Sequence, residues 1–162
     1  MHTCATALDL AGVTVPDHLL ADAAVPLLTG PQAQGDLLVV PAYPLRSTPW
    51  RPVPPDGVQL VHGEATGNTH WLHRGFDSSG MTWCRPAGPD EGDRLVVAHL
   101  RVPDGQSALL IHTDEHGANG IGPGDYVIKR KRQLGTEPDE PAALEGLVPL
   151  VRPRLSDMFV AD

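Results

Sequence analysis

Imidazole and carboxylate side chains gather in two short segments of this chain. The first runs from His62 to His73 and the second from His112 to His116, and together they hold five of the eight histidines. In an extended strand, side chains two residues apart project from the same face. Imidazoles and carboxylates that converge on one face can bind a metal ion or transfer protons. The two segments are therefore the candidate functional site.

Period-two alternation selects particular members of each segment. One face of the first segment would carry His62, Glu64, Thr66, Asn68 and His70, and one face of the second would carry His112, Asp114 and His116. Two or three imidazoles with one carboxylate are a common ligand set for zinc, iron or manganese. We take Glu64, His70 and His116 as candidate catalytic residues and His62, His70, His112 and His116 as candidate ligands of a divalent metal.

Two other interpretations of these residues stay open. The same groups could form a metal-free acid–base pair, with Glu64 orienting a histidine. Alternatively, the histidines only finish strands and bond to turns, and the chain is a non-catalytic interaction or assembly module. Whether the chain is an enzyme is not decided by the sequence, and the spacing of the ligands names no reaction.

Composition excludes several classes of function. The formal net charge is −8 and the sequence pI is near 5.3, which argues against a nucleic-acid partner or an anionic membrane surface. No apolar run approaches the roughly 18 residues of a membrane span. The N-terminus shows no basic segment followed by a continuous apolar stretch, so we expect a cytoplasmic protein. The two cysteines, Cys4 and Cys84, cannot make a disulfide framework.

The elements that would position the site are short strands. Gly and Pro number 17 each, which favours many turns. Branched apolar runs between those turns predict strands at 37–40, 58–62, 94–100, 108–112 and 126–129. Turns at regular spacing between short strands predict an all-β domain, barrel-like or sandwich-like. Gly35-Asp36 is predicted to be one of the turns.

Three regions are expected along the chain. Residues 1–33 form an N-terminal arm, 34–134 the β-rich core domain and 135–162 a C-terminal tail. Thr14 to Asp17 resembles a helix start with Pro16 in the first turn, and Leu19, Leu20, Ala23 and Ala24 would then face the body. The arm is expected to dock on the core or on a protein partner, including a second copy of the chain.

The run from Lys129 to Arg132 is the only basic cluster in the sequence. Alternation divides it into a face with Lys129 and Lys131 and a face with Arg130 and Arg132. One face could bind a phosphate-bearing ligand. The other interpretation is a solvated edge strand whose charges resist edge-to-edge pairing.

The order of several motifs resembles a family of small bacterial and phage proteins without an assigned activity. The motifs are Gly35-Asp36-Leu-Leu, Gly63-Glu64-Ala-Thr66-Gly67, Glu115-His116-Gly117, Pro123-Gly124-Asp-Tyr126-Val-Ile-Lys-Arg130 and Val160-Ala161-Asp162. The resemblance implies that Glu64, His70 and His116 fall on motif positions. This chain has Asn68 where the family pattern has the first histidine of an H-x-H pair, and an amide is a poor metal ligand. A partial similarity to the ligand segments of cupin barrels is weaker, because Asn68 breaks the pair.

Overall fold

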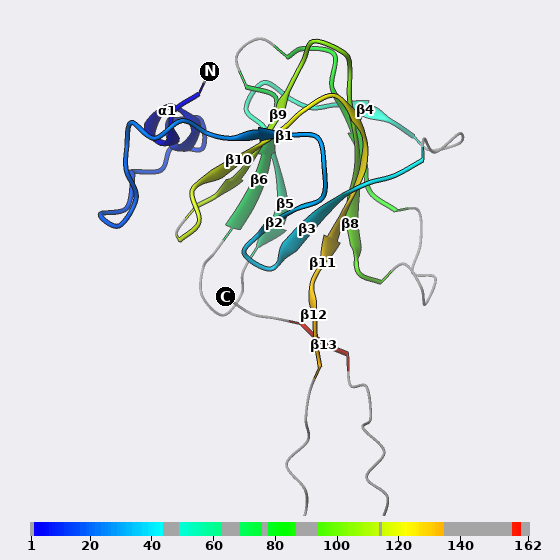
Figure 1. Cartoon of the computed structure of the whole chain (residues 1–162). Coiled ribbons are helices and arrows are strands. Elements are labelled where there is room, and N and C mark those ends of the chain that lie inside the picture. Colours follow the sequence, from blue (N-terminus) through cyan, green and yellow to red (C-terminus); the bar gives the residue numbers. More distant parts are fainter. Residues whose placement is uncertain are drawn as a thin grey trace, which may run out of the picture.

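The protein is an all-β sandwich. A computed structural model describes residues 2–43, 49–62, 69–75, 78–86, 94–113, 115–134 and 157–159. Within these ranges the chain forms one short helix and thirteen strands, eleven of which build two sheets that face each other (Figure 1). The all-β prediction is confirmed, and of its two forms the chain adopts the sandwich.

The first sheet has five strands. Their order is β1 (Leu27–Leu28), β10 (Ala118–Ile121), β9 (Ala108–His112), β6 (Thr69–His73) and β5 (Val58–His62). β1 runs parallel to β10, and the other pairs are antiparallel. The two segments of the candidate site thus contribute neighbouring strands, because β6 pairs directly with β9.

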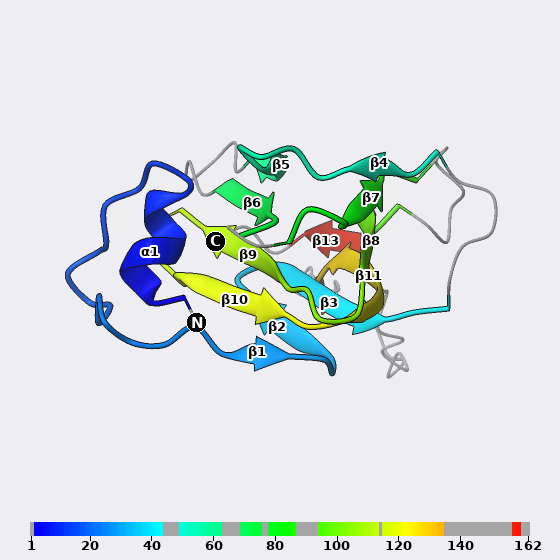
Figure 2. The same ribbon diagram turned by 90° about the horizontal axis from the view of Figure 1, so that it is seen from above.

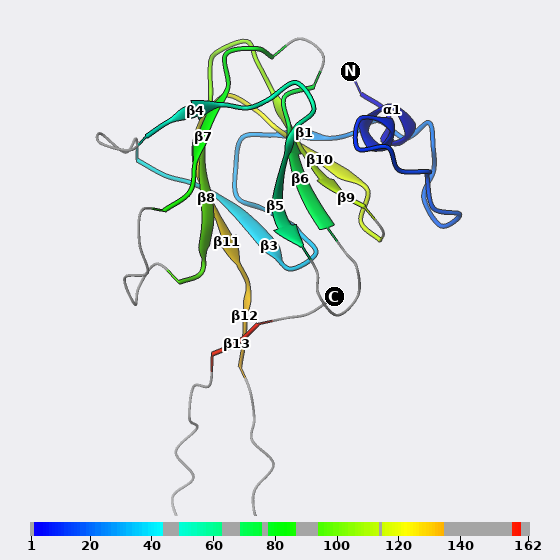
Figure 3. The same cartoon turned by 180° about the vertical axis from the view of Figure 1, so that it is seen from behind.

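The second sheet has six strands. Their order is β2 (Gln32–Gln34), β3 (Leu37–Pro41), β11 (Gly124–Arg130), β8 (Val96–Val102), β7 (Thr82–Cys84) and β4 (Arg51–Pro52). All of its pairs are antiparallel. Figures 2 and 3 show this sheet beside the first, with β3, β11 and β8 in one layer and β9, β6 and β5 in the other.

The main hydrophobic core lies between the two sheets. Leu72 and Leu110 project into it from the first sheet, and Leu37, Leu100 and Ile128 from the second; all five are fully buried. Burying a side chain of this size stabilises the fold by about 1.5–3 kcal/mol. Because side chains alternate along a strand, the neighbours of Leu72 and Leu110 face away from this core.

The N-terminal arm covers that outer face. Its helix α1 (Cys4–Asp9) packs Cys4, Ala7 and Leu8 against Leu109 and Ile111 of β9 (Figure 2). The arm therefore docks on its own sheet, and β9 is buried on both faces. This explains why every residue of β9 is buried and why its sequence is almost uniformly apolar.

The prediction of a helix that begins near Thr14 is wrong, because residues 14–24 form turns and extended chain. The carbonyl groups of Ala21 and Ala23 accept bonds from the backbone N–H groups of Ala5 and Cys4, at 2.9 and 2.8 Å. They thereby satisfy the first N–H groups of α1, which have no partner inside a helix. The helix forms earlier in the chain instead, where Thr3 and Thr6 make a capping box.

Strands also lie in the segments that the sequence assigns to the arm and to the tail. β1 and β2 lie within residues 27–34, so the sandwich already begins at Leu27. After β11 comes β12 (Arg132–Leu134), which pairs with β13 (Asp157–Phe159) near the end of the chain (Figure 1). Residues 157–159 of the expected tail therefore lie beside the strand that directly follows β11. No helix in the described ranges is long and apolar enough to cross a membrane.

Candidate functional site

His70 and His112 lie side by side between the two sheets. They are partners in the β6–β9 register, their ring centroids are 4.5 Å apart, and the rings meet edge to face at 77°. Leu72 and Leu110, two residues further along the same strands, belong to the central core, so both imidazoles point into the sandwich. Their exposed fractions are 2% and 0%.

Asp36 approaches His70 from the opposite sheet. It lies in the turn between β2 and β3, and its Oδ1 is 3.5 Å from Nδ1 of His70. Lys131 holds this turn, because its backbone N–H donates to the carbonyl of Asp36 at 2.8 Å and its ammonium group donates to the carbonyl of Gly35. Asp36 is thus both a turn residue and a partly buried neighbour of an imidazole.

His116 extends the cluster toward solvent. Its ring centroid lies 4.8 Å from that of His112, with the planes tilted by 54°, and its side chain is 40% exposed. His112 Nδ1 accepts the backbone N–H of Glu115 at 3.0 Å and that of His116 at 3.4 Å. An acceptor at Nδ1 places the ring proton of neutral His112 on Nε2.

Buried backbone contacts fix this end of the sandwich. The amide of Gln34, on β2, donates to the carbonyls of Leu110 and Gly117 at 3.1 and 3.0 Å, and so ties the two sheets together beside the cluster. Gly117 closes the turn after β9 with a φ of 64°, a conformation that glycine adopts without strain. The strand that carries His112 and the turn after it are therefore tied to the opposite sheet.

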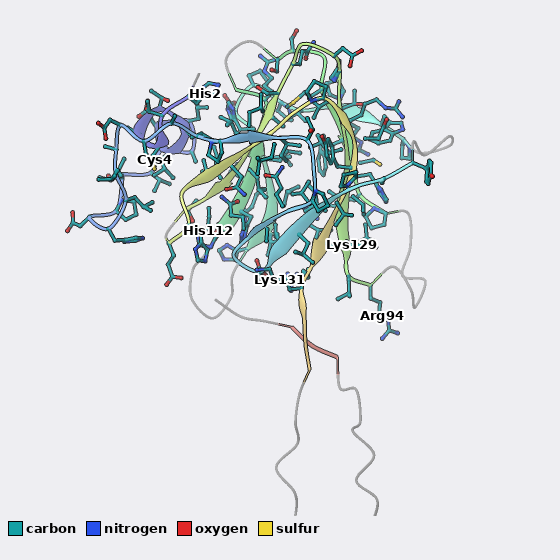
Figure 4. The ribbon with its side chains drawn as sticks, in the orientation of Figure 1. His2, Cys4, Arg94, His112, Lys129 and Lys131 are labelled. Carbon is teal, nitrogen blue, oxygen red and sulfur yellow. The ribbon has the colours of Figure 1, made fainter. Side chains whose placement is uncertain are left out.

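Three of the predicted site residues come together, and a fourth does not. His70, His112 and His116 form the cluster at the lower end of the sandwich, where Figure 4 shows His112 and Lys131. His62 pairs in register with Thr69, so it projects from the face opposite His70; its Nδ1 lies 3.3 Å from the hydroxyl oxygen of Thr69. Glu64 and Asn68 lie outside the described residues.

The described residues do not form a metal-binding site. No three side chains of histidine, cysteine, aspartate or glutamate in those ranges are placed to hold one ion. The arrangement that is present is a series of ionisable groups, Asp36, His70, His112 and His116, in which each neighbouring pair is in contact or within 3.5 Å. Such a series can hold and move protons.

The sequence predicts Asp36 only as a turn residue. Its approach to His70 spans the two sheets, which no local pattern reveals. One signal was present, since Gly35-Asp36 is the first motif in the family-like order that also contains His116.

The fold and the cluster define the class of this protein: an all-β sandwich with a buried imidazole–carboxylate cluster at one end. The chain belongs to a family described as a domain of unknown function, DUF8820, whose model matches residues 33–131. That range spans the strands from β2 to β11 and includes Asp36, His70, His112 and His116. No curated protein and no solved structure matches the chain.

Proposed function

We propose that this chain is an enzyme that performs acid–base chemistry on a small molecule, with His116 as the group that exchanges a proton with the ligand. The observation that carries the proposal is the run of ring contacts from half-exposed His116 to buried His112 and His70, with the Asp36 carboxylate 3.5 Å from His70. A carboxylate behind an imidazole selects its tautomer and stabilises its charged form. His112, His70 and Asp36 act as positioning residues behind His116.

A groove beside His116 offers a place for the ligand. It has a volume of about 160 Å³ and lies between the arm and β10. Its walls are mostly apolar, and Cys4, Leu19, Ala23 and Pro26 of the arm line it together with His116 and Gly117. A small molecule held there would be shielded from water on the side of the arm while one polar group contacts the imidazole.

The series can be tested without knowing the substrate. We would record imidazole ¹⁵N chemical shifts of the wild type and of the Asp36→Ala variant. We expect the shifts of His70, His112 and His116 all to change, because loss of the carboxylate alters the proton position along the series. His62 is the matched control, since it lies on the other face of the sheet and its shifts should stay constant. A change confined to His70 would disprove the series.

Catalysis needs a second measurement. Small carbonyl compounds with acidic C–H bonds are incubated with the protein in D₂O, and loss of their proton signals is followed by NMR. We expect His116→Gln to slow the exchange by about a hundredfold or more, the usual contribution of a general base. His62→Gln should leave the rate unchanged. Exchange at equal rates in both variants would show that His116 is not the base.

A metal-dependent reaction is the second candidate, because His70 and His112 are in contact and Glu64, which lies outside the described residues, could complete a ligand set. Zinc, iron or manganese would need ligands from His70, His112 and His116 with a carboxylate such as Glu64. Metal analysis of the purified protein tests this directly. One equivalent of metal that is lost in a His70→Ala, His116→Ala double variant would support a metal centre, and absence of stoichiometric metal would exclude it.

The interaction module also keeps one specific observation in its favour. Leu20 and Leu27, on the arm and its first strand, expose 74% and 58% of their surface. Large apolar side chains that stay exposed can mark a contact with a partner, here a second copy of the chain. Sedimentation of the wild type and of a Leu20→Ser, Leu27→Ser variant would show whether the chain associates through this surface.

A further inference from the structure

The loop of the N-terminal arm between α1 and β1 forms one wall of the groove beside His116. Leu19 and Ala23 of this loop line the groove together with His116 and Gly117. Figure 2 shows the loop passing around α1 at the outside of the molecule. The groove has a volume of about 160 Å³, which is below the roughly 300–1,000 Å³ of sites that bind small-molecule ligands. A ligand of ordinary size therefore enters only if a wall of the groove moves.

Both ends of this loop are fixed to the rest of the arm. Val15 packs against the buried cluster that α1 and β9 form, and residues 21–25 bond through their backbone to residues 2–5. Residues 16–20 lie between these anchors, and in the described part of the chain their backbone bonds only within the loop. The middle of the loop is therefore the part that can move while the arm stays docked.

The side chains of His18 and Leu19 connect the middle of the loop to the turn between β9 and β10. Nε2 of His18 lies 2.9 Å from the carbonyl oxygen of Glu115. Because a carbonyl can only accept a hydrogen bond, the imidazole donates this one. Leu19 lies over Gly117, with its Cδ1 3.3 Å from the position that a Cβ would take there. His18 is exposed, so water competes for its bond and the bond contributes only modestly.

Glu115 links this contact to the imidazole cluster. Its carbonyl accepts the bond from His18, and its backbone N–H donates to Nδ1 of His112 at 3.0 Å. The turn that receives the loop is therefore the turn that fixes the tautomer of His112. Closure of the groove and the state of the cluster meet at one residue.

We propose that residues 16–20 form a lid over the groove beside His116, held closed by the hydrogen bond from His18 to the carbonyl of Glu115. When this bond breaks, Leu19 moves away from Gly117 and a ligand can enter the groove. The lid depends on the proposed function in one respect, namely that this groove is the ligand site. Opening of the lid can be measured without any catalytic step, so the lid and the acid–base reaction can fail separately.

Cys4 reports whether the lid is open. It lines the groove, its Sγ is 3.5 Å from the position of a Cβ at Gly117, and it is 9% exposed. Burial also raises the pKa of the Cys4 thiol, so the closed state reacts slowly with an alkylating reagent. Cys84 is the matched control, because it is 2% exposed and lies in β7 of the other sheet, away from the arm.

The experiment is alkylation of the full chain by iodoacetamide, with mass spectrometry of peptides to follow the two cysteines separately. We expect His18→Ala to accelerate the labelling of Cys4 about fivefold, the factor that corresponds to one exposed hydrogen bond. His18→Gln should label at the rate of the wild type, since its amide can still donate to the carbonyl of Glu115. Cys84 should label at the same rate in all three proteins.

The outcomes separate a lid from general loosening of the fold. An unchanged labelling rate of Cys4 in His18→Ala would overturn the lid, because the bond would then not hold the loop closed. Equal acceleration of Cys4 and Cys84 would overturn it as well, since the variant would act through unfolding of the sandwich. Faster labelling of Cys4 alone, restored in His18→Gln, supports the lid even where no acid–base reaction is found.

Discussion

Strand β6 carries two buried histidines that differ in the groups they contact. His70 and His73 are three residues apart, so they project from opposite faces of the sheet, and their exposed fractions are 2% and 5%. Nδ1 of His73 accepts the backbone N–H of Gly75 at 3.0 Å, and its ring also bonds to the backbone of Pro55. Burial lowers the pKa of His73, so this ring is neutral.

The neighbours of His70 are ionisable instead. It lies against the carboxylate of Asp36 and the imidazole of His112. Equal burial therefore conceals a difference in partners. His73 bonds to backbone groups, whereas His70 contacts a carboxylate and a second imidazole, which are groups that can exchange protons.

The largest expected effect is the loss of stability in His73→Leu. Leucine fills a similar volume but cannot bond to Gly75 or Pro55, which leaves the backbone N–H of buried Gly75 without its partner. Space near Gly57 is also tight, since the ring of His73 lies within 2.9 Å of the position that a Cβ would take there. We expect the free energy of unfolding to fall by about 2–3 kcal/mol, measured by urea denaturation.

A His73→Asn variant is the control for that result, because its side-chain oxygen can still accept the N–H of Gly75. It should recover part of the lost stability. If His73→Leu unfolds with the same free energy as the wild type, His73 is not the backbone brace that the structure shows, and the contrast with His70 fails.

The second expected effect is a dependence of stability on pH. The ordinary pKa of histidine is 6.5, and burial lowers the pKa of His73 in the folded chain. Below about pH 6.5 the unfolded state takes up this proton before the folded state does, so acidification reduces stability until the folded pKa is reached. One proton contributes at most about 1.4 kcal/mol per pH unit. Urea denaturation between pH 5 and 8 should show a smaller slope in His73→Leu than in the wild type.

Much of the fold is predictable from local sequence because its strands are short apolar runs between glycine and proline turns. Leu37–Val40 and Ala108–His112 are examples, and both are strands in the structure. The arm was harder, since the capping box of Thr3 and Thr6 leaves a weaker signal than the proline at position 16. Which segment became helical depended on the carbonyls of Ala21 and Ala23, which only the folded arm brings near α1.

The candidate site, like the fold, is predictable from the sequence only in part. His70 and His112 could be anticipated from alternation along their strands, and their register makes them neighbours. The bulge at Leu60 affects which residues of β5 face the core, and His62 lies on the outer face with Thr69. Asp36 comes from the other sheet, so its approach to His70 depends on tertiary packing that no spacing in the sequence encodes.

Joint replacement of Asp36 and His70 by leucine should have a smaller effect than His73→Leu and of the opposite sign. Replacing both partners of a buried ionisable pair by apolar side chains is often neutral or stabilising, whereas removing one partner alone is destabilising. We expect the free energy of unfolding to equal that of the wild type or to exceed it by up to about 1 kcal/mol. A loss as large as that of His73→Leu would mean that both histidines of β6 are structural and would remove the basis for the acid–base proposal.

The smallest expected effect is that of His62→Gln. His62 is exposed at the edge strand, and its ring meets only the hydroxyl group of Thr69 among the contacts that the described residues show. Surface substitutions of this kind change stability by less than about 0.5 kcal/mol, and glutamine can still bond to Thr69. The imidazole ¹⁵N shifts of His70 and His112 should also stay the same, since His62 lies on the other face of the sheet. Altered shifts at His70 in this variant would show that His62 communicates with the cluster after all, and the site would then extend across both faces of β6.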